Sequence, residues 1–189
     1  MLSVKESLTF FTNFLRDPEV ASVVPTSGIA VHRICKKMNF GARRVFVEYG
    51  PGTGPLSRGV LERMTPDSRL ILIDRNKTLV AYLREHMRDP RVSIHHDTAE
   101  NVEAIVKACR LQHADYVLSS IPFSRLPVEN ARAITQSTAN VLAPDGAFIA
   151  YQFLPVVGRY MRETFQEVDR SFILWNFPPL LVYEARNTP

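Results

Sequence analysis

The chain has 189 residues, of which 46% are hydrophobic and 22% charged, so it is long enough for one well-buried domain and short for two. Its net charge of +4 suits an anionic partner, such as lipid headgroups or nucleic acid, but is too small to identify one. Because no stretch approaches the roughly 20 apolar residues of a membrane-spanning helix and the N-terminus lacks a signal-peptide core, we expect a cytoplasmic protein, at most peripheral to a membrane.

The first predicted element is an amphipathic helix at residues 4–16. The apolar residues that recur there at helical spacing are Leu8, Phe11, Phe14 and Leu15. Such a helix either lies in a membrane interface or packs on its own domain. We expect residues 1–24 to form this helix and a connector, and residues 25–189 to form the domain.

A second helix is predicted to follow Pro25 and to run to Met38, with Thr26 or Ser27 as its N-terminal cap. Its basic side chains either form a solvated face or contact a phosphate. The loop at 26–28 is a candidate for closing over a bound cofactor, which makes Thr26 and Ser27 candidate binding residues.

The most informative stretch is RRVFVEYGPGTG at residues 43–54, a hydrophobic strand that runs into a turn with glycine at positions 50, 52 and 54. Glycine adopts positive φ readily and lets the backbone approach a ligand, so the stretch suits a nucleotide-sized group lying across a strand end. A glycine-rich turn can also be a plain connection, and the turn alone does not separate the two.

Two acidic residues stand at the ends of the next predicted strands, 69–74 and 91–96. Asp74 lies 20 residues beyond Gly54, where an acid can accept hydrogen bonds from both ribose hydroxyls. Asp97 could contact an adenine amino group. Either aspartate could instead cap the helix that follows it. The helices predicted around these strands are 56–64, 77–88 and one that begins near Thr98.

A fourth strand, 115–119, leads into the loop SSIPFSRLP at 119–127. This loop leaves the sheet at its carboxyl edge, where open α/β folds build their reaction sites. Ser119 and Ser120 offer polar groups, and Phe123 an apolar wall. No histidine and acid are placed to activate a serine, so the loop favours positioning of a substrate without a covalent intermediate.

The remaining pattern predicts further helices and strands, ending in two closely spaced strands. The predicted elements are a helix at 128–141, a turn at 143–146, a strand at 147–153, a helix at 157–166 and strands at 168–175 and 179–185. Two neighbouring strands after a series of βα units indicate an antiparallel pair at one sheet edge. One α/β domain is therefore expected.

The cysteines and histidines give no sign of a metal site. Cys35 and Cys109 lie far apart within helical patterns, which is typical of reduced core thiols. His95 and His96 have no accompanying cluster of carboxylates or cysteines, so we expect polar residues at a strand end. The sequence predicts no oligomeric state.

Taken together, VEYGPGTG, Asp74, HDTAEN, the fourth-strand loop and the terminal strand pair resemble the class I S-adenosylmethionine-dependent methyltransferases. The resemblance implies a single Rossmann-like methyltransferase domain with a seven-stranded, mostly parallel sheet, an antiparallel terminal strand pair and helices on both faces, preceded by the amphipathic helix. It also implies S-adenosyl-L-methionine as cofactor, S-adenosyl-L-homocysteine as product, and no metal.

The same resemblance assigns the cofactor-binding residues. Asp74 would hold the ribose and Asp97 the adenine. The methionine portion would be surrounded by Glu48, Gly50, Gly52 and Gly54. The residues expected to complete the site are Tyr49, Arg75, Thr98, Ala99, Ser119, Thr26 and Ser27.

Within the class, the chain is similar to the bacterial phospholipid N-methyltransferases, which methylate phosphatidylethanolamine. The similarity rests on FFTNFLRDPEVASVVPTSG, SSIPFSRLP, YQFLP and NFPPLLVYEAR. It implies a phospholipid substrate with an amine headgroup and binding to the inner face of the cell membrane through residues 4–16. No nucleic-acid partner is expected.

Direct methyl transfer from a sulfonium to an amine needs alignment of the reactants and a neutral amine lone pair. Tyr151 and Phe123 are candidate aromatic walls for the methylated cationic headgroup, through cation–π attraction, or are packing residues. Ser120, which stands where the family commonly has glycine, is the third candidate catalytic residue. Arg125 and Arg159 are candidates for holding a lipid phosphate.

Two other functions stay open. A ribosomal RNA adenine dimethyltransferase shares the GPGTG turn, but those enzymes resemble one another through an asparagine-leucine-proline-aromatic loop, where asparagine grips a flipped adenine. This chain has Ser120-Ile121-Pro122-Phe123 at that point. The second alternative is a module that binds S-adenosylmethionine without catalysis.

Overall fold

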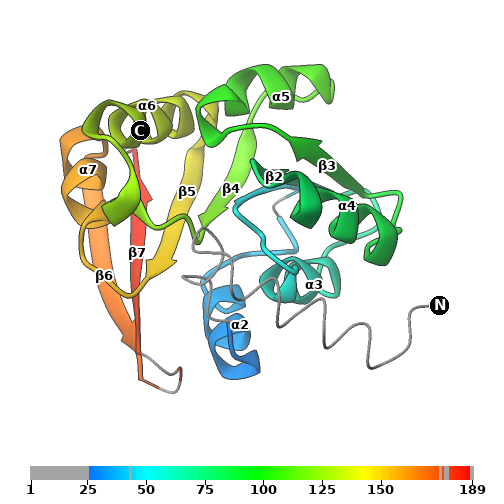
Figure 1. The fold of residues 1–189 in the computed structure, drawn as a ribbon, viewed down its shortest axis with the longest axis horizontal. Coiled ribbons are helices and arrows are strands. Elements are labelled where there is room, and N and C mark those ends of the chain that lie inside the picture. Colours follow the sequence, from blue (N-terminus) through cyan, green and yellow to red (C-terminus); the bar gives the residue numbers. More distant parts are fainter. Residues whose placement is uncertain (1–25, 43, 175, 177–178, 188–189) are drawn as a thin grey trace.

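The structure is a computed structural model that describes residues 26–42, 44–174, 176 and 179–187. The amphipathic helix expected at 4–16, and the whole of the expected segment 1–24, lie outside the described residues. Figure 1 shows the described part as a layered arrangement of helices and one twisted sheet.

The sheet has seven strands in the order β3-β2-β1-β4-β5-β7-β6. The pairs β1·β2, β1·β4, β2·β3 and β4·β5 are parallel, whereas β7 is antiparallel to both β5 and β6. The strands are β1 (Val45–Tyr49), β2 (Arg69–Asp74), β3 (Val92–His96), β4 (Ala114–Ser119), β5 (Leu142–Gln152), β6 (Glu167–Ile173) and β7 (Leu180–Arg186). The expected mostly parallel sheet with an antiparallel terminal pair is confirmed.

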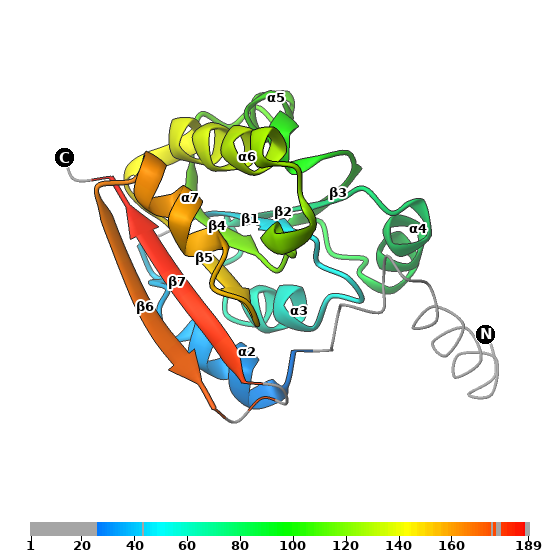
Figure 2. The same ribbon diagram turned by 60° about the vertical axis from the view of Figure 1, so that its left-hand side comes forward.

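Helices cover both faces of this sheet, as expected (Figure 2). One face packs against α2 (Gly28–Cys35), α3 (Pro55–Leu61) and α4 (Lys77–His86). The other packs against α5 (Val102–Ala108), α6 (Val128–Val141) and α7 (Val157–Thr164), with short 3-10 helices at Ala99–Asn101 and Phe123–Arg125. Ser27 caps α2 by accepting a hydrogen bond from the Ala30 N–H at 3.2 Å.

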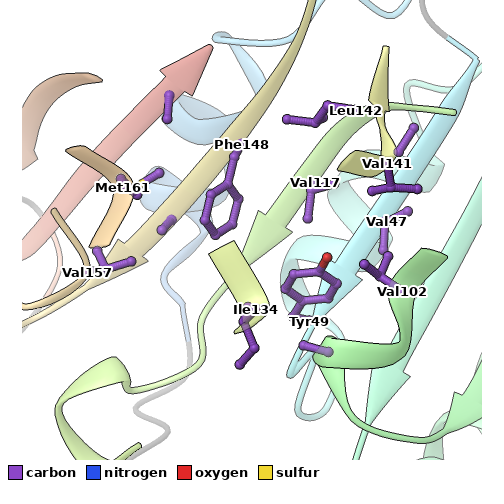
Figure 3. Packing of buried hydrophobic residues seen from close by; sticks show 14 of the residues in the cluster. Val47, Tyr49, Val102, Val117, Ile134, Val141, Leu142, Phe148, Val157 and Met161 are labelled. Carbon is purple, nitrogen blue, oxygen red and sulfur yellow. The ribbon is translucent and has the colours of Figure 1, made fainter. Parts of the chain in front are cut away.

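The alternation of side chains along β1 divides the core between these two faces. Phe46 points toward the α2 and α3 side, where it packs beside Tyr116. Val47 and Tyr49 point to the other side, into the cluster shown in Figure 3. Both faces of the central strands are therefore buried, which accounts for their nearly continuous apolar sequences.

One expected turn is wrong. Residues 143–146 were predicted to form a turn before the fifth strand, but β5 already begins at Leu142. Its register against β4 shifts, because Ala114 pairs with Leu142 and Tyr116 pairs with Ala147. The intervening residues, which include a proline without an N–H group, form an irregularity within one strand rather than a separate turn.

Helix α7 lies very close to β7. A Cβ atom added at Gly158 would stand 2.4 Å from Cε1 of Tyr183, so no other residue fits there without movement. The Tyr183 hydroxyl also donates a hydrogen bond to the Pro155 carbonyl at 3.5 Å. This contact fixes the segment that leaves the carboxyl end of β5.

Candidate active site

The glycine turn connects β1 to α3 at the carboxyl edge of the sheet. Gly50, Gly52 and Gly54 have φ values of 62°, 60° and 81°, which residues with a side chain rarely adopt. The Gly50 N–H donates to the carbonyl of Ile73 at 2.9 Å, so the turn is joined to the end of β2. The backbone of the glycine turn is thus held in a position where a ligand can approach it closely.

Glu48 is the buried acid of the site. Its side chain is fully shielded from solvent, and it accepts hydrogen bonds from Ser57 Oγ at 2.5 Å and from the Tyr151 hydroxyl at 3.3 Å. Burial raises the pKa of Glu48 to about 7, although both hydrogen bonds lower it; the charge of Asp74 adds to the rise. The carboxyl group is therefore poised to change its charge near neutral pH.

Tyr151 stands at the end of β5 on the same side of the sheet as Glu48. It is 4% exposed, and burial raises its pKa well above 10, so its hydroxyl keeps its proton at neutral pH. The side chains of Ser120 and Thr26 also lie within hydrogen-bonding reach of this hydroxyl. Ser120 Oγ donates to the Gly50 carbonyl at 2.5 Å. Residues predicted separately from four segments thus meet in one cluster.

Tyr49 and Ser119 lie on the opposite side of the sheet. The Tyr49 hydroxyl shares a hydrogen bond of 3.0 Å with the Thr138 hydroxyl, and its ring packs beside Phe148. Ser119 is opposite Tyr49 in the register of β1 and β4, and its Oγ accepts from the Ile121 N–H at 3.3 Å. The side chains of both residues therefore point away from Glu48, and beside the glycine turn the Ser120 N–H donates to the Tyr49 carbonyl at 3.3 Å.

Asp74 closes the end of β2 with an 8% exposed side chain. Its Oδ1 accepts from the Asn76 N–H at 2.8 Å, and the Gly52 N–H also donates to the carboxylate. Burial raises the pKa of Asp74, and these backbone hydrogen bonds oppose the rise. The side chain of Arg75, the next residue, is exposed.

Asp97 lies at the end of β3, next to Asp74 through a hydrogen bond from its N–H to the Asp74 carbonyl at 3.2 Å. Its Oδ1 accepts from the Thr98 N–H and from Asn101 Nδ2, both at 2.8 Å. Both hydrogen bonds lower the pKa of the Asp97 carboxyl group, and the bond from Asn101 has the larger effect. Asp97 is not the N-cap of the helix that follows, since that position is taken by Thr98, and buried Ala99 begins the 3-10 helix.

Phe123 does not join Tyr151. Its ring is 1% exposed and packs against Tyr160 of α7 with the ring centroids 6.3 Å apart. The two predicted aromatic walls therefore lie on different sides of the sheet. Of the two arginines, Arg159 forms an ion pair with Glu163 at 3.0 Å on the outer surface of α7.

Two residues near the site escaped prediction. Ser57 faces Glu48 from the first turn of α3, and a buried strand carboxylate is itself a signal that a nearby donor is needed. Asn176 accepts from the Ser27 N–H through Oδ1 at 3.0 Å, which joins the start of α2 to the segment between β6 and β7. No local sequence pattern predicts a contact across 149 residues.

These residues fit an adenosyl cofactor. A side chain at Gly50 would be crowded, since a Cβ atom there would approach Ile121 Cγ1 to 3.3 Å. One acid is the next-to-last residue of β1, a second ends β2 and a third lies just beyond β3. Among the residues that the structure describes, no group of three or more histidine, cysteine or acidic side chains is arranged to hold a metal ion.

The strand order with its reversed seventh strand, the glycine turn after β1 and the acid at the end of β2 define a class I S-adenosylmethionine-dependent methyltransferase. Residues 46–146 match the methyltransferase domain family, and the chain belongs to that family.

Solved structures agree with this fold. Precorrin-6y C5,15-methyltransferase from Geobacter metallireducens superposes with a TM-score of 0.68 at 13% identity, over 93% of this chain and 96% of that one. The N-methyltransferase NodS from Bradyrhizobium japonicum gives a TM-score of 0.64 at 16% identity, over 84% and 93%. At these identities the similarity concerns the fold alone.

Two characterised relatives are similar in sequence. Ornithine lipid N-methyltransferase from Singulisphaera acidiphila is 28% identical over 186 residues, which cover 97% of each chain. Ribosomal RNA small subunit methyltransferase H from Leptothrix cholodnii is 33% identical over 89 residues, 46% of this chain and 27% of the relative.

Proposed function

We propose that this methyltransferase transfers methyl groups to the amine headgroup of a membrane lipid, with phosphatidylethanolamine and amino-acid lipids as candidate acceptors. The observation that carries the proposal is the relationship along 97% of both chains to an enzyme named for N-methylation of an amine-bearing lipid. That similarity includes the segments flanking the cofactor site, which differ most between methyltransferases of different substrates.

The cofactor residues take the following roles in the proposal. Bound S-adenosylmethionine supplies a methyl group on a positively charged sulfur. The backbone of the turn 50–54, together with Glu48, holds the methionine portion, Asp74 the ribose and Asp97 the adenine. Because the pKa of Glu48 is about 7, its carboxylate becomes available for a cationic amino group as the pH rises through neutrality. The exposed positions at Arg75 and Thr98 complete the outer side of this site.

Tyr151 is proposed to position the acceptor. Its hydroxyl is fixed on Glu48 at 3.3 Å, which holds the ring at the end of β5. The ring face then stabilises the cationic ammonium that grows as methyl groups are added. Ser120, bonded to Gly50, sets the position of the loop over this ring. Phe123 packs against the Tyr160 ring of α7, so its proposed contribution is to anchor that loop.

Membrane attachment is proposed to be peripheral, on the inner face of the cell membrane. None of the helices in the described ranges is long and apolar enough to cross a bilayer. Residues 4–16 are the proposed anchor. Deletion of residues 1–16 is expected to reduce sedimentation with anionic liposomes at unchanged S-adenosylmethionine affinity. Equal sedimentation of the two proteins would reject the anchor.

One alternative has an observation of its own, namely the 89-residue similarity to a ribosomal RNA methyltransferase. It covers 46% of this chain and 27% of the relative, so it supports this alternative less than the lipid relative supports the proposal. A module that binds the cofactor without turnover is the other alternative, and measurement of activity decides it.

The test is transfer of labelled methyl groups to separate vesicle preparations. Phosphatidylethanolamine and a phosphorus-free amino-acid lipid provide amines, and phosphatidylglycerol is the matched lipid without one. We expect label in at least one amine lipid and none in phosphatidylglycerol. Absence of label from every amine lipid would reject the proposal.

A further inference from the structure

Gln152 holds a buried polar atom that pairs with nothing in the part of the chain that the structure describes. The residue ends β5 and is 6% exposed, and among the described residues no partner accepts a hydrogen bond from its Nε2 atom. Buried amide groups are nearly always paired, because an unpaired one loses its hydrogen bonds to water without replacement. This amide can therefore donate a hydrogen bond to a bound ligand.

Gln152 lies at the carboxyl edge of the sheet, where the candidate active site is. It follows Tyr151 directly, so its side chain points to the opposite side of the sheet, the side of α6 and α7. Ala150, two residues earlier on that same side, is opposite Ser119, from which the loop 119–127 begins. The amide therefore lies where the acceptor loop and the end of β5 meet.

An apolar row leads from this amide to the surface. Gln152 is opposite Leu181 in β7, and Leu181 is in turn opposite Phe172 in β6. Residues opposite one another in a sheet share a face, so these three form one row across the strands. Exposure rises along it, from the buried amide through half-buried Leu181 to Phe172, which is 53% exposed.

The exposed end of the row combines apolar side chains with a positive charge, which suits an amphipathic molecule. The Arg170 guanidinium lies 5.4 Å from the centre of the Phe172 ring, so a positive charge accompanies the exposed apolar end. Leu154 and Leu174, which follow β5 and β6, are 54% and 70% exposed and extend the apolar surface at this edge. The segment between β5 and α7 forms bends and turns rather than strand or helix.

We propose that Gln152 Nε2 donates a hydrogen bond to a headgroup oxygen of the acceptor lipid, while Leu181 and Phe172 seat the apolar part of the same molecule. Because an NH₂ group only donates, the partner is a phosphate or carbonyl oxygen near the amine, never the ammonium. The inference rests on the proposed function. It adds a site that fixes the distance between the reacting nitrogen and the rest of the lipid, so Gln152 is a positioning and specificity residue.

The test compares Gln152→Leu and Gln152→Glu with the wild-type protein in methyl transfer to amine lipids. Gln152→Leu is expected to raise the apparent KM for the lipid about tenfold, which is the loss of one hydrogen bond to a charged or carbonyl oxygen, with an unchanged Kd for S-adenosylmethionine. Its melting temperature should not fall, since the unpaired polar group is removed. Gln136→Leu, an exposed glutamine on α6, is the matched control and should change neither value.

A comparison of two lipids shows whether the oxygen that accepts the hydrogen bond from Gln152 belongs to a phosphate or to a carbonyl group. Gln152→Glu places a negative charge at the site. A larger rise in KM for phosphatidylethanolamine than for a phosphorus-free amino-acid lipid would identify a phosphate oxygen as the partner of Gln152, and equal rises would identify a carbonyl oxygen. Phe172→Ser should raise KM for long-chain vesicle lipid and leave KM for a short-chain soluble analogue unchanged. Val128→Ser, a change off the row at a residue that is 47% exposed against 53% for Phe172, should leave both KM values unchanged.

The outcomes separate this inference from the function on which it rests. If the wild-type protein labels no lipid, the proposed function fails and the inference fails with it. If the wild-type protein labels lipid but Gln152→Leu keeps the same KM, or loses cofactor affinity by the same factor, the lipid function stands and the role of Gln152 is overturned.

Discussion

The Tyr151 hydroxyl donates a hydrogen bond to Glu48 Oε1 at 3.3 Å, which joins the carboxyl ends of β5 and β1 across 103 residues of sequence. The bond connects the residue proposed to receive the acceptor with the acid proposed to hold the methyl donor. It also lowers the pKa of Glu48, against the stronger effect of burial. The two proposed binding functions of the site therefore share this one hydrogen bond.

Tyr151→Phe tests whether this hydrogen bond couples the two side chains. Without the hydroxyl, the pKa of Glu48 should rise further above its ordinary value, because one hydrogen bond that favours the charged form is lost. The midpoint of the pH dependence of S-adenosylmethionine affinity should move upward, with a several-fold weaker affinity at pH ~7.5 that recovers at pH ~9. Calorimetric titration over this range measures it. An identical midpoint in both proteins would show that the two side chains are not coupled.

Glu48 also predicts a pH dependence of stability. Its pKa is about 7 in the folded protein against an ordinary value of 4.5, so only the folded state keeps the proton between these values. The stabilising contribution is complete below pH 4.5 and is lost as the pH rises through about 7, on the order of 3 kcal/mol in total.

Urea unfolding of the wild-type protein and of Glu48→Gln, at pH ~5 and pH ~8.5, isolates this contribution from that of other titrating groups. The free energy of unfolding of Glu48→Gln should fall less between the two pH values than that of the wild-type protein. A parallel fall in both proteins would place the pKa of Glu48 near its ordinary value.

Asp74→Asn tests the assignment of the ribose. Asparagine keeps an oxygen for the Asn76 N–H, which Asp74 accepts at 2.8 Å, so the turn after β2 should survive. Loss of the second acceptor should weaken S-adenosylmethionine binding about tenfold to a hundredfold, because in the proposed assignment two hydrogen bonds from ribose hydroxyls depend on the charged group. Affinity within twofold of wild type would reject the assignment.

Gly158→Ala tests the contact between α7 and β7. The added methyl group would stand 2.4 Å from Tyr183 Cε1, so unfolding free energy should fall by about 1–3 kcal/mol through overpacking. Gly28→Ala is the matched control, since nothing lies within 4 Å of a Cβ atom there. That change, in the first turn of α2, should be neutral or slightly stabilising. Equal melting temperatures for the two variants would contradict the close packing.

Much of the fold was predictable because local patterns carry it. The apolar run in RLILID predicted β2 with Asp74 at its end, and the two closely spaced strands at the C-terminus predicted the antiparallel pair. The register shift within β5 was not predictable, since residues 143–146 have the composition of a turn, and only the pairing of Leu142 and Ala147 on either side of them with β4 shows that they lie within one strand.

The site was predictable in outline and less so in the direction of its side chains. Alternation along VFVEY places Glu48 and Tyr49 on opposite sides of the sheet, a signal that the sequence contains and that separates one proposed binding residue from one core residue. The partners of Glu48 come from α3 and from β5, so the cluster of Glu48, Ser57 and Tyr151 depends on the order of strands and not on any local pattern.

The most direct test of the account is a competition in a single reaction. Vesicles of phosphatidylethanolamine and an amino-acid lipid are mixed with ribosomal RNA and labelled S-adenosylmethionine, and the label is measured in the lipid and RNA fractions after extraction. The account predicts label in the lipid fraction, on the headgroup nitrogen, and none above background in RNA. Label in RNA alone would contradict it.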